Sequence, residues 1–216
     1  MLRLHLVRHG HTIWNDTGGV AGRTDIGLSE KGQQAVTDLA RTWSPMDHLD
    51  SWHSSPLSRT RHTTQLLREG GFQSQELPEV LMDERLVELD FGRWEGMTWQ
   101  SVHENYQQEM DLWGQDWVNR SPPDGETFSH QAARCEAFLQ TLVDGFQSDT
   151  SLSAHHAMVV LHGGSIRALV CLCMGWPLTK AMSFQVDPAT VTTLDLSDGD
   201  AGWTLRQLNS RNFKSD

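Results

Sequence analysis

The sequence predicts a three-layer α/β/α fold built around a mostly parallel β-sheet. Segments with strand-like patterns alternate along the chain with amphipathic, helix-like segments, which is typical of strands joined by crossover helices. Some of these strands end directly in charged or titratable side chains, and ligands of such folds bind beyond the carboxyl ends of the strands. A length of 216 residues suits one domain. We therefore expect a single domain over residues 1–216, with residues 97–121 as a helical insertion that covers the site.

The first half of the chain is expected to contain two strands and two helices. Residues 2–7 alternate between apolar and polar side chains, as a half-buried strand does. Ser29 has the position of a helix N-cap, because apolar residues recur at helical spacing after it. A short strand is expected at 49–54, and Pro56 can then open a second helix, since proline is well tolerated in a first helical turn.

The middle of the chain is expected to be helical. Between Met97 and Trp117 large apolar residues recur mostly every three or four positions, which predicts one or two amphipathic helices. The Pro-Pro-Asp-Gly sequence at 122–125 ends this pattern. A longer helix follows, and its apolar face runs from Phe128 to Phe146.

The last part of the chain is expected to contain a buried strand, a helix and a hairpin. Residues 157–161 form a continuous apolar run, as expected of a strand that is buried on both faces. His162 and two glycines end this run, and a helix is expected at 165–174. A β-hairpin is expected between residues 190 and 208, with its turn at 197–200.

The bulk composition excludes several classes of function. A formal net charge of −11 argues against binding to nucleic acid or to an anionic membrane, which both require a positive protein surface. The three cysteines, Cys135, Cys171 and Cys173, lie in apolar stretches, so we expect buried, reduced thiols. The chain starts directly with a strand and shows no signal peptide or membrane-spanning run, so we expect a cytoplasmic protein.

Three strand ends carry side chains that suit one anion-binding pocket. Arg8 and His9 follow the first strand. Arg59 lies in the first turn after the second strand, and His162 follows the buried strand. Because parallel strands end at the same edge of a sheet, we expect these side chains to share one pocket. Helix N-termini at that edge would add backbone N–H donors and a positive dipole end.

These residue types fit the transfer of a phosphoryl group. A neutral His9 could attack phosphorus and form a phosphohistidine, which divides one difficult displacement into two easier ones. Arg8 and Arg59 could hold the phosphate oxygens with paired hydrogen bonds. His162, if protonated, would add a third positive charge. Because these cations neutralise the phosphate, we expect no metal and no cofactor.

The leaving group also needs a proton donor. A carboxylic acid can supply the proton and, once it is a carboxylate, can activate water. The acid-rich stretch 83–96 is the expected source of this group. The pattern alone does not separate Glu84, Glu88 and Glu95.

Four sequence blocks resemble the histidine phosphatase superfamily, whose members share the phosphoglycerate-mutase-like fold. The blocks occur in the family's order and are Leu6–Gly10, Ser54–Arg59, Glu88–Gly96 and Leu161–Arg167. The resemblance implies that His9 is the nucleophile and that Glu88 is the proton donor. It also implies a phosphate pocket of Arg8, Arg59 and His162, and substrate-binding positions at Asn15, Gly22 and Gly163.

Within the superfamily, the chain resembles the alpha-ribazole phosphatases, which act late in cobalamin synthesis. This resemblance rests on residues 122–128 and on the stretches 184–187 and 208–211. It implies that the substrate is alpha-ribazole 5'-phosphate, a small-molecule phosphomonoester. Broad-specificity phosphatases of similar length share these features and stay an alternative. His11 departs from the family, which usually has Glu or Gln at that position.

The insertion favours hydrolysis over mutase activity. A mutase must hold a second phosphate, but residues 97–120 contain one basic residue, Arg120, and four acidic ones. Cofactor-dependent phosphoglycerate mutase stays an alternative, and so does a non-catalytic binding or scaffold protein, although all five expected catalytic residues are present. Aromatic residues of the insertion could stack on an aromatic leaving group or could only dock the insertion; they are Trp99, Tyr106, Trp113 and Trp117.

Several further side chains have a structural interpretation. A metal cluster of His5, His9 and His11 is disfavoured, because alternate residues after a glycine need not share a face. Arg167 is interpreted as a structural ion-pair partner. The roles of His11 and His62 stay open. The terminal hairpin offers a sheet edge that a homodimer could use.

Overall fold

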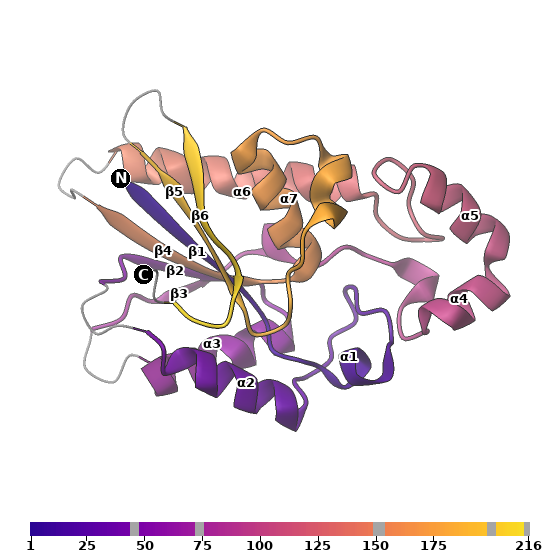
Figure 1. The fold of residues 1–216 in the computed structure, drawn as a ribbon, viewed down its shortest axis with the longest axis horizontal. Coiled ribbons are helices and arrows are strands. Elements are labelled where there is room, and N and C mark those ends of the chain that lie inside the picture. Colours follow the sequence, from indigo (N-terminus) through magenta and orange to yellow (C-terminus); the bar gives the residue numbers. More distant parts are fainter. Residues whose placement is uncertain (44–47, 72–75, 149–153, 198–201, 214–216) are drawn as a thin grey trace.

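The computed structural model describes most of the chain, and Figure 1 shows its fold. The residues that it does not describe are 44–47, 72–75, 149–153, 198–201 and 214–216. Most of the turn expected at 197–200 therefore lies outside the described residues.

A six-stranded sheet with the order β3-β2-β4-β1-β5-β6 forms the centre of the molecule. The pairs β3-β2, β2-β4 and β4-β1 are parallel, whereas β5 pairs antiparallel with both β1 and β6. The mostly parallel sheet and the terminal hairpin are thus confirmed. The bounds are β1 Leu2–Arg8, β2 Ser51–Ser54, β3 Val80–Met82, β4 His155–Leu161, β5 Val191–Leu196 and β6 Trp203–Ser210.

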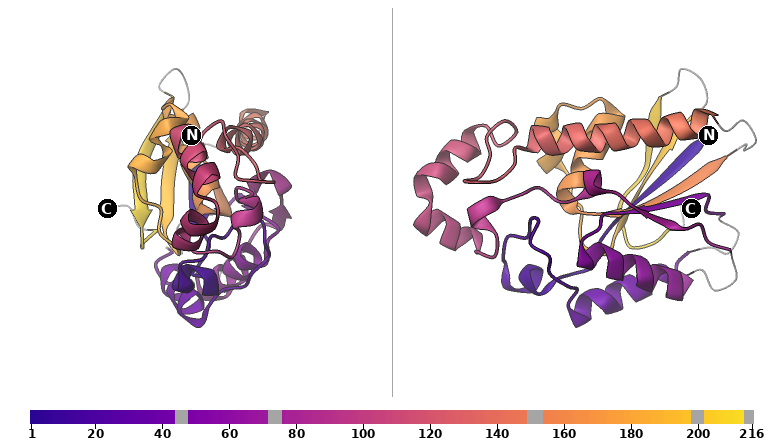
Figure 2. Two further views of the ribbon diagram at one scale, coloured as in Figure 1. Left: turned by 90° about the vertical axis from the view of Figure 1, so that its right-hand side faces the viewer. Right: turned by 180° about the vertical axis from the view of Figure 1, so that it is seen from behind.

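Helices cover both faces of this sheet and make it the middle of three layers (Figures 1 and 2). One apolar cluster joins the sheet to α2 and α3, and a second cluster joins its other face to α6 and α7. Within the described residues, no helix combines the length and the apolar character needed to cross a bilayer. The bounds are α2 Glu30–Ala40, α3 Ser58–Gly71, α6 Phe128–Ser148 and α7 Gly163–Met174.

The two central strands supply side chains to both apolar clusters. In β1, Leu6 packs on the side of α6 and α7, whereas Val7 packs on the side of α2 and α3. In β4, Val159 and Val160 divide in the same way. All four side chains are fully buried. This two-sided burial explains the continuous apolar run in β4, because both of its faces need apolar side chains.

The helices next to the strand ends begin at defined residues. Ser29 is the expected N-cap of α2, since its side chain accepts a backbone hydrogen bond of 3.3 Å from the first turn. α7 begins at Gly163, two residues earlier than expected, because His162 adopts the extended conformation of an N-cap. α3 begins at Ser58, so Pro56 precedes the helix and does not lie in its first turn as expected. The N-termini of α3 and α7 thus lie close after the carboxyl ends of β2 and β4.

The insertion forms two helices, α4 Trp99–Asn105 and α5 Gln107–Gln115. They project beyond the sheet at one end of the molecule (Figure 2). An aromatic cluster holds them there: the Trp113 ring lies edge-on to Trp94, with 5.5 Å between ring centroids, and stacks on Trp99 at 6.0 Å. Docking is therefore one role of the tryptophans in this insertion.

Some short elements were not predicted from the sequence. β3 spans three residues, and α1 is the single short helix Ile13–Thr17. Neither is long enough to show a period of apolar residues. The same holds for three short 3₁₀-helices, η1 Glu84–Leu86, η2 Gly92–Trp94 and η3 Leu178–Ser183.

His5 of β1 is expected to make the stability of the fold depend on pH. Its ring is buried and makes edge contacts with Trp43 and Phe213, at 5.3 and 6.2 Å between ring centroids. Burial, followed by the nearby His156 and Arg3, lowers the pKa of His5 from 6.5 to about 3. Between these two pH values the unfolded chain binds a proton that the folded chain does not bind. The folded state therefore loses stability as the pH falls from 6.5 towards 3.

We expect His5→Leu to reduce this pH dependence. One proton contributes about 1.4 kcal/mol per pH unit, so the variant is expected to lose about 2 kcal/mol less unfolding free energy than the wild type between pH 7 and pH 5. Urea denaturation at both pH values measures this difference. Each protein is compared with itself, so the packing change cancels. Equal losses in the two proteins would contradict the assignment.

Candidate active site

A cavity of about 340 Å³ lies beyond the carboxyl ends of β1 and β4, next to the insertion. Its wall combines polar and apolar side chains from segments that are far apart in the sequence. The polar side chains are Arg8, His9, Asn15, Glu88 and Arg167. The large apolar side chains are Val20, Leu89, Phe91, Trp99, Phe128 and Met182.

His9 is held so that one ring nitrogen stays free. Its backbone N–H donates to the carbonyl of Leu161 at 3.0 Å, just beyond the paired strands. Its Nδ1 lies 2.7 Å from the carbonyl oxygen of Gly10, so Nδ1 carries the proton and Nε2 keeps its lone pair. Burial, followed by Arg59 and Arg8, lowers the pKa of His9 well below 6.5. The ring is therefore neutral, which is the form that a nucleophile requires.

Arg8 has a donor that the protein does not use. Its Nη1 donates to the carbonyl of Val186 at 2.5 Å, whereas its buried Nε has no hydrogen-bond partner among the described residues. A buried N–H without a partner is costly, and an anion in the cavity would satisfy it. A Cβ atom on Gly163 would lie 3.4 Å from this Nε, so the glycine brings its backbone close to the arginine. Arg8 and Gly163 together fit a phosphate oxygen.

Arg59 and His162 form a fully buried layer behind His9. Arg59 Nε donates to His162 Nδ1 at 3.2 Å, and the His162 ring lies edge-on to His9 with 5.1 Å between ring centroids. The two Nη atoms of Arg59 donate to the carbonyls of Gly22 and Thr24 at 2.6 and 3.0 Å. Neither Arg59 nor His162 is among the residues that line the described cavity. These contacts use three of the five N–H groups of Arg59.

His162 is neutral in this arrangement. Because Nδ1 accepts from Arg59, Nε2 carries the proton and donates it to Ser55 Oγ at 2.8 Å. Burial, followed by Arg59 and His9, lowers the pKa of His162 well below 6.5. A third positive charge in the pocket would require a protonated His162. Because the ring is neutral, His162 does not supply that charge. The positive charge around His9 comes from the arginines.

The structure separates the three candidate glutamates. Glu88 is buried and lines the cavity, and its Oε2 accepts from the backbone N–H of Gly164 at 3.1 Å. Glu95 instead accepts from the backbone N–H groups of residues 23–24 at 2.8 and 2.7 Å, so it fixes the loop that binds Arg59. Glu84 is exposed. Of the three, Glu88 has the position of a proton donor.

The three expected substrate-binding positions differ in where they lie. Asn15 lines the cavity, and its Oδ1 accepts a backbone N–H in the cap of α1, which leaves the Nδ2 donor for a ligand. Gly163 lines the cavity in the first turn of α7. Gly22 is not among the lining residues; its carbonyl holds Arg59, and residues 19–21 line the cavity instead.

Two buried polar residues of the site were missed in the sequence. Ser55 accepts from His162, and it lies inside one of the four blocks that carry the family resemblance. Gln131 on α6 donates to Glu88 at 2.9 Å. Its position on the apolar face of the helix 128–146 is the signal that could have found it, because a fully buried glutamine needs a partner.

Arg167 does not form the expected ion pair with any residue that the structure describes. Its Nη1 donates to the backbone carbonyls of Ala181, at 2.6 Å, and Phe184. The guanidinium carbon lies 5.5 Å from the centroid of the Phe184 ring. Arg167 is therefore fixed by η3 while it lines the cavity.

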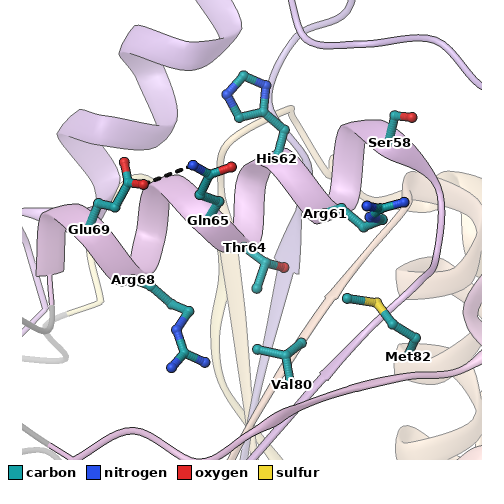
Figure 3. Close-up of a pocket in the computed structure, with 9 residues that line it drawn as sticks. All are labelled: Ser58, Arg61, His62, Thr64, Gln65, Arg68, Glu69, Val80 and Met82. Carbon is teal, nitrogen blue, oxygen red and sulfur yellow. Dashed lines mark hydrogen bonds between the residues drawn. The ribbon is translucent and has the colours of Figure 1, made fainter.

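The two histidines with open roles lie outside this cavity. His11 lines a second cavity of about 390 Å³ together with Lys31 and Arg211. His62 lies on α3 beside a larger cavity of about 580 Å³, which is lined by side chains of α3 and β3 (Figure 3). Neither cavity includes His9. In the part of the chain that the structure describes, no group of three or more His, Cys, Asp or Glu side chains is placed to hold a metal ion.

Known proteins are similar to this chain over nearly its whole length. The family model of the histidine phosphatase superfamily (branch 1) matches residues 4–211. The chain is 31% identical over 212 residues to the adenosylcobalamin/alpha-ribazole phosphatase of Salmonella typhimurium, and 97% of each protein is covered. It is also 31% identical over 198 residues to phosphoserine phosphatase 1 of Hydrogenobacter thermophilus, with 92% of this chain and 88% of that protein covered.

Solved structures share the fold as well. The alpha-ribazole phosphatase from Shigella flexneri superposes with a TM-score of 0.84 at 27% sequence identity, and 99% of each chain is covered. Because the family model matches nearly the whole chain, the chain belongs to the histidine phosphatase superfamily.

Proposed function

We propose that the chain hydrolyses small phosphomonoesters through a phosphohistidine formed at Nε2 of His9. The observation that carries this proposal is the hydrogen bond of 2.7 Å from His9 Nδ1 to the Gly10 carbonyl. It fixes the tautomer in which Nε2 has a free lone pair. Burial and the two neighbouring arginines keep the ring neutral by lowering its pKa, so the nucleophile is available at neutral pH.

In the first step, Nε2 of His9 attacks phosphorus while the bond from phosphorus to the leaving oxygen breaks. The guanidinium group of Arg8 and the backbone N–H of Gly163 bind the phosphate oxygens, where negative charge builds up in the transition state. The buried Arg59 adds its positive charge from behind His9. Glu88 enters this step as a carboxylic acid and gives its proton to the leaving oxygen. The leaving group therefore departs as an alcohol, and Glu88 becomes a carboxylate.

In the second step, water attacks the phosphohistidine and the bond from phosphorus to Nε2 breaks. The Glu88 carboxylate accepts a proton from the water, so that inorganic phosphate is released and both side chains return to their starting forms. Asn15 offers its amide donor to the substrate, and Gly22 acts through Arg59, which its carbonyl holds. His162 keeps Arg59 aligned through the hydrogen bond of 3.2 Å.

We expect His9→Ala to lower phosphatase activity by about 10³-fold or more, because no other group in the cavity replaces the nucleophile. Wild-type enzyme that is denatured at alkaline pH during turnover is expected to carry phosphate that acid then releases, and the variant is expected to carry none. His62→Ala is the matched control, since His62 lies outside the cavity. Activity is also expected to persist in EDTA. Loss of activity on chelation that added metal restores would contradict the metal-free mechanism.

For the substrate we propose alpha-ribazole 5'-phosphate, whose leaving group is an aromatic riboside. The support comes from the apolar wall of the cavity, where Trp99 is 42% exposed and makes an edge contact with Phe91 at 5.9 Å between ring centroids. An exposed indole offers a stacking surface for a flat ring. The similarity to a relative named alpha-ribazole phosphatase favours the same substrate.

A carboxylate-bearing phosphomonoester is the second candidate. Arg167 lines the same cavity and has N–H groups beyond those bound to the carbonyls of η3. A relative with 31% identity is named a phosphoserine phosphatase. A mutase is less favoured, because the insertion carries four acidic residues and one basic residue and would repel a second phosphate.

We expect Trp99→Ala to raise KM for alpha-ribazole 5'-phosphate by roughly 3- to 10-fold, which is the usual size of one aromatic contact. KM for phosphoserine is expected to change far less, because that leaving group has no ring to stack. Trp176→Ala serves as the control, since Trp176 is exposed outside the cavity. If KM rises equally for both substrates, the stacking hypothesis is wrong and Trp99 only docks the insertion.

A further inference from the structure

Glu88 is the proposed proton donor. Among its described hydrogen bonds, one comes from an amide side chain, that of Gln131. Gln131 lies on α6 and is fully buried. Its Nε2 donates to Glu88 Oε1 at 2.9 Å and to Ser165 Oγ at 3.1 Å. These two bonds use both N–H groups of the amide. The amide orientation is thereby fixed, because a flipped amide would place its oxygen against the carboxylate.

The two oxygens of Glu88 are held differently. Oε1 accepts from the Gln131 amide and from the backbone N–H of Leu89, each at 2.9 Å. Oε2 accepts from the backbone N–H of Gly164 alone, at 3.1 Å. A carboxylate oxygen has two lone-pair directions, so Oε1 is saturated and Oε2 keeps one lone pair open. A proton that Glu88 takes up therefore finds its place on Oε2.

Neighbouring residues hold the Gln131 amide and the Glu88 carboxylate in place. Arg134, one turn further along α6, donates to the backbone carbonyls of Val87 and Glu88 at 2.6 and 3.0 Å. Ser165 Oγ lies 3.0 Å from the same Val87 carbonyl, which it can bind while it accepts from Gln131. A Cβ atom on Gly164 would lie 2.3 Å from Glu88 Oε1, so no side chain separates α7 from the carboxylate. The carboxylate is thus held between α6 and α7.

We propose that Gln131 is a positioning residue that confines the transferable proton of Glu88 to Oε2. This inference rests on the proposed function, in which Glu88 protonates the leaving oxygen. An amide suits the task because it donates at every pH and never competes for the proton. Gln131 is not among the residues that line the described cavity, so it acts through Glu88.

The test compares substrates that need the proton to different degrees. Benzyl phosphate has a poor leaving group and depends on a general acid, phenyl phosphate is intermediate, and p-nitrophenyl phosphate leaves readily without one. All three carry an aromatic ring, which keeps the apolar wall equally occupied. The value of kcat/KM is compared because it reports the step in which the leaving group departs.

We expect Gln131→Met to lower kcat/KM by about 10- to 100-fold for benzyl phosphate and by less than about 3-fold for p-nitrophenyl phosphate, a part of what a general acid contributes. Ser165→Ala, which frees the amide at its other end, is expected to give a smaller loss with the same order of substrates. Gln140→Met is the matched control: Gln140 lies on the same helix, and its amide binds the exposed Asp144 at 2.7 Å. Equal losses on all three substrates in Gln131→Met and Ser165→Ala would overturn the proposal.

Glu88→Gln in the same assays separates the inference from the function beneath it. Glu88→Gln is expected to lower kcat/KM in the same order of substrates as Gln131→Met, with a larger difference between benzyl phosphate and p-nitrophenyl phosphate. In the double variant, Gln131→Met is expected to add nothing to that difference. A flat profile for Glu88→Gln would overturn the acid role of Glu88 and the inference with it. A sloped profile for Glu88→Gln with a flat profile for Gln131→Met would overturn the inference alone.

Discussion

The parallel pairing of β1 with β4 is the constraint on which the site depends. Its register aligns Arg8 with Leu161, so that His9 and His162 emerge side by side where the two strands end. Both strands are buried on their two faces, and a slip by one residue would move apolar side chains to the wrong layer. The packing of the core therefore fixes the distance between the two imidazoles.

A chain of hydrogen bonds connects the loop at 23–24 to the histidines at the strand ends. Glu95 fixes the loop at 23–24, the carbonyls of that loop orient Arg59, and Arg59 in turn binds His162 behind His9. Burial of these groups has an electrostatic consequence, because it lowers the pKa of both histidines and keeps them neutral. The same burial that makes His9 a nucleophile destabilises the fold in acid, since unfolding allows the rings to take up protons.

Much of this site could be predicted from the sequence, because strands and their ends leave a local pattern. The apolar run before His162 and the alternation before Arg8 place both residues at the sheet edge. The assignments that needed the structure depend on contacts between distant segments. The residue pattern does not separate Glu88 from Glu95, the family resemblance favours Glu88, and the structure shows the different contacts of the two side chains. Of the four aromatic residues of the insertion, Trp99 alone is among those that line the described cavity, and the periodic spacing that they share cannot show this.

The stereochemistry at phosphorus tests the phosphohistidine most directly. The enzyme is given a phosphomonoester made chiral with three oxygen isotopes together with an acceptor alcohol, and the configuration of the phosphomonoester formed on that alcohol is determined. Each in-line displacement inverts phosphorus, so two successive displacements, first by His9 and then by the acceptor, give net retention. Retention is the expected result. Inversion would mean direct attack on the substrate and would contradict a covalent role for His9.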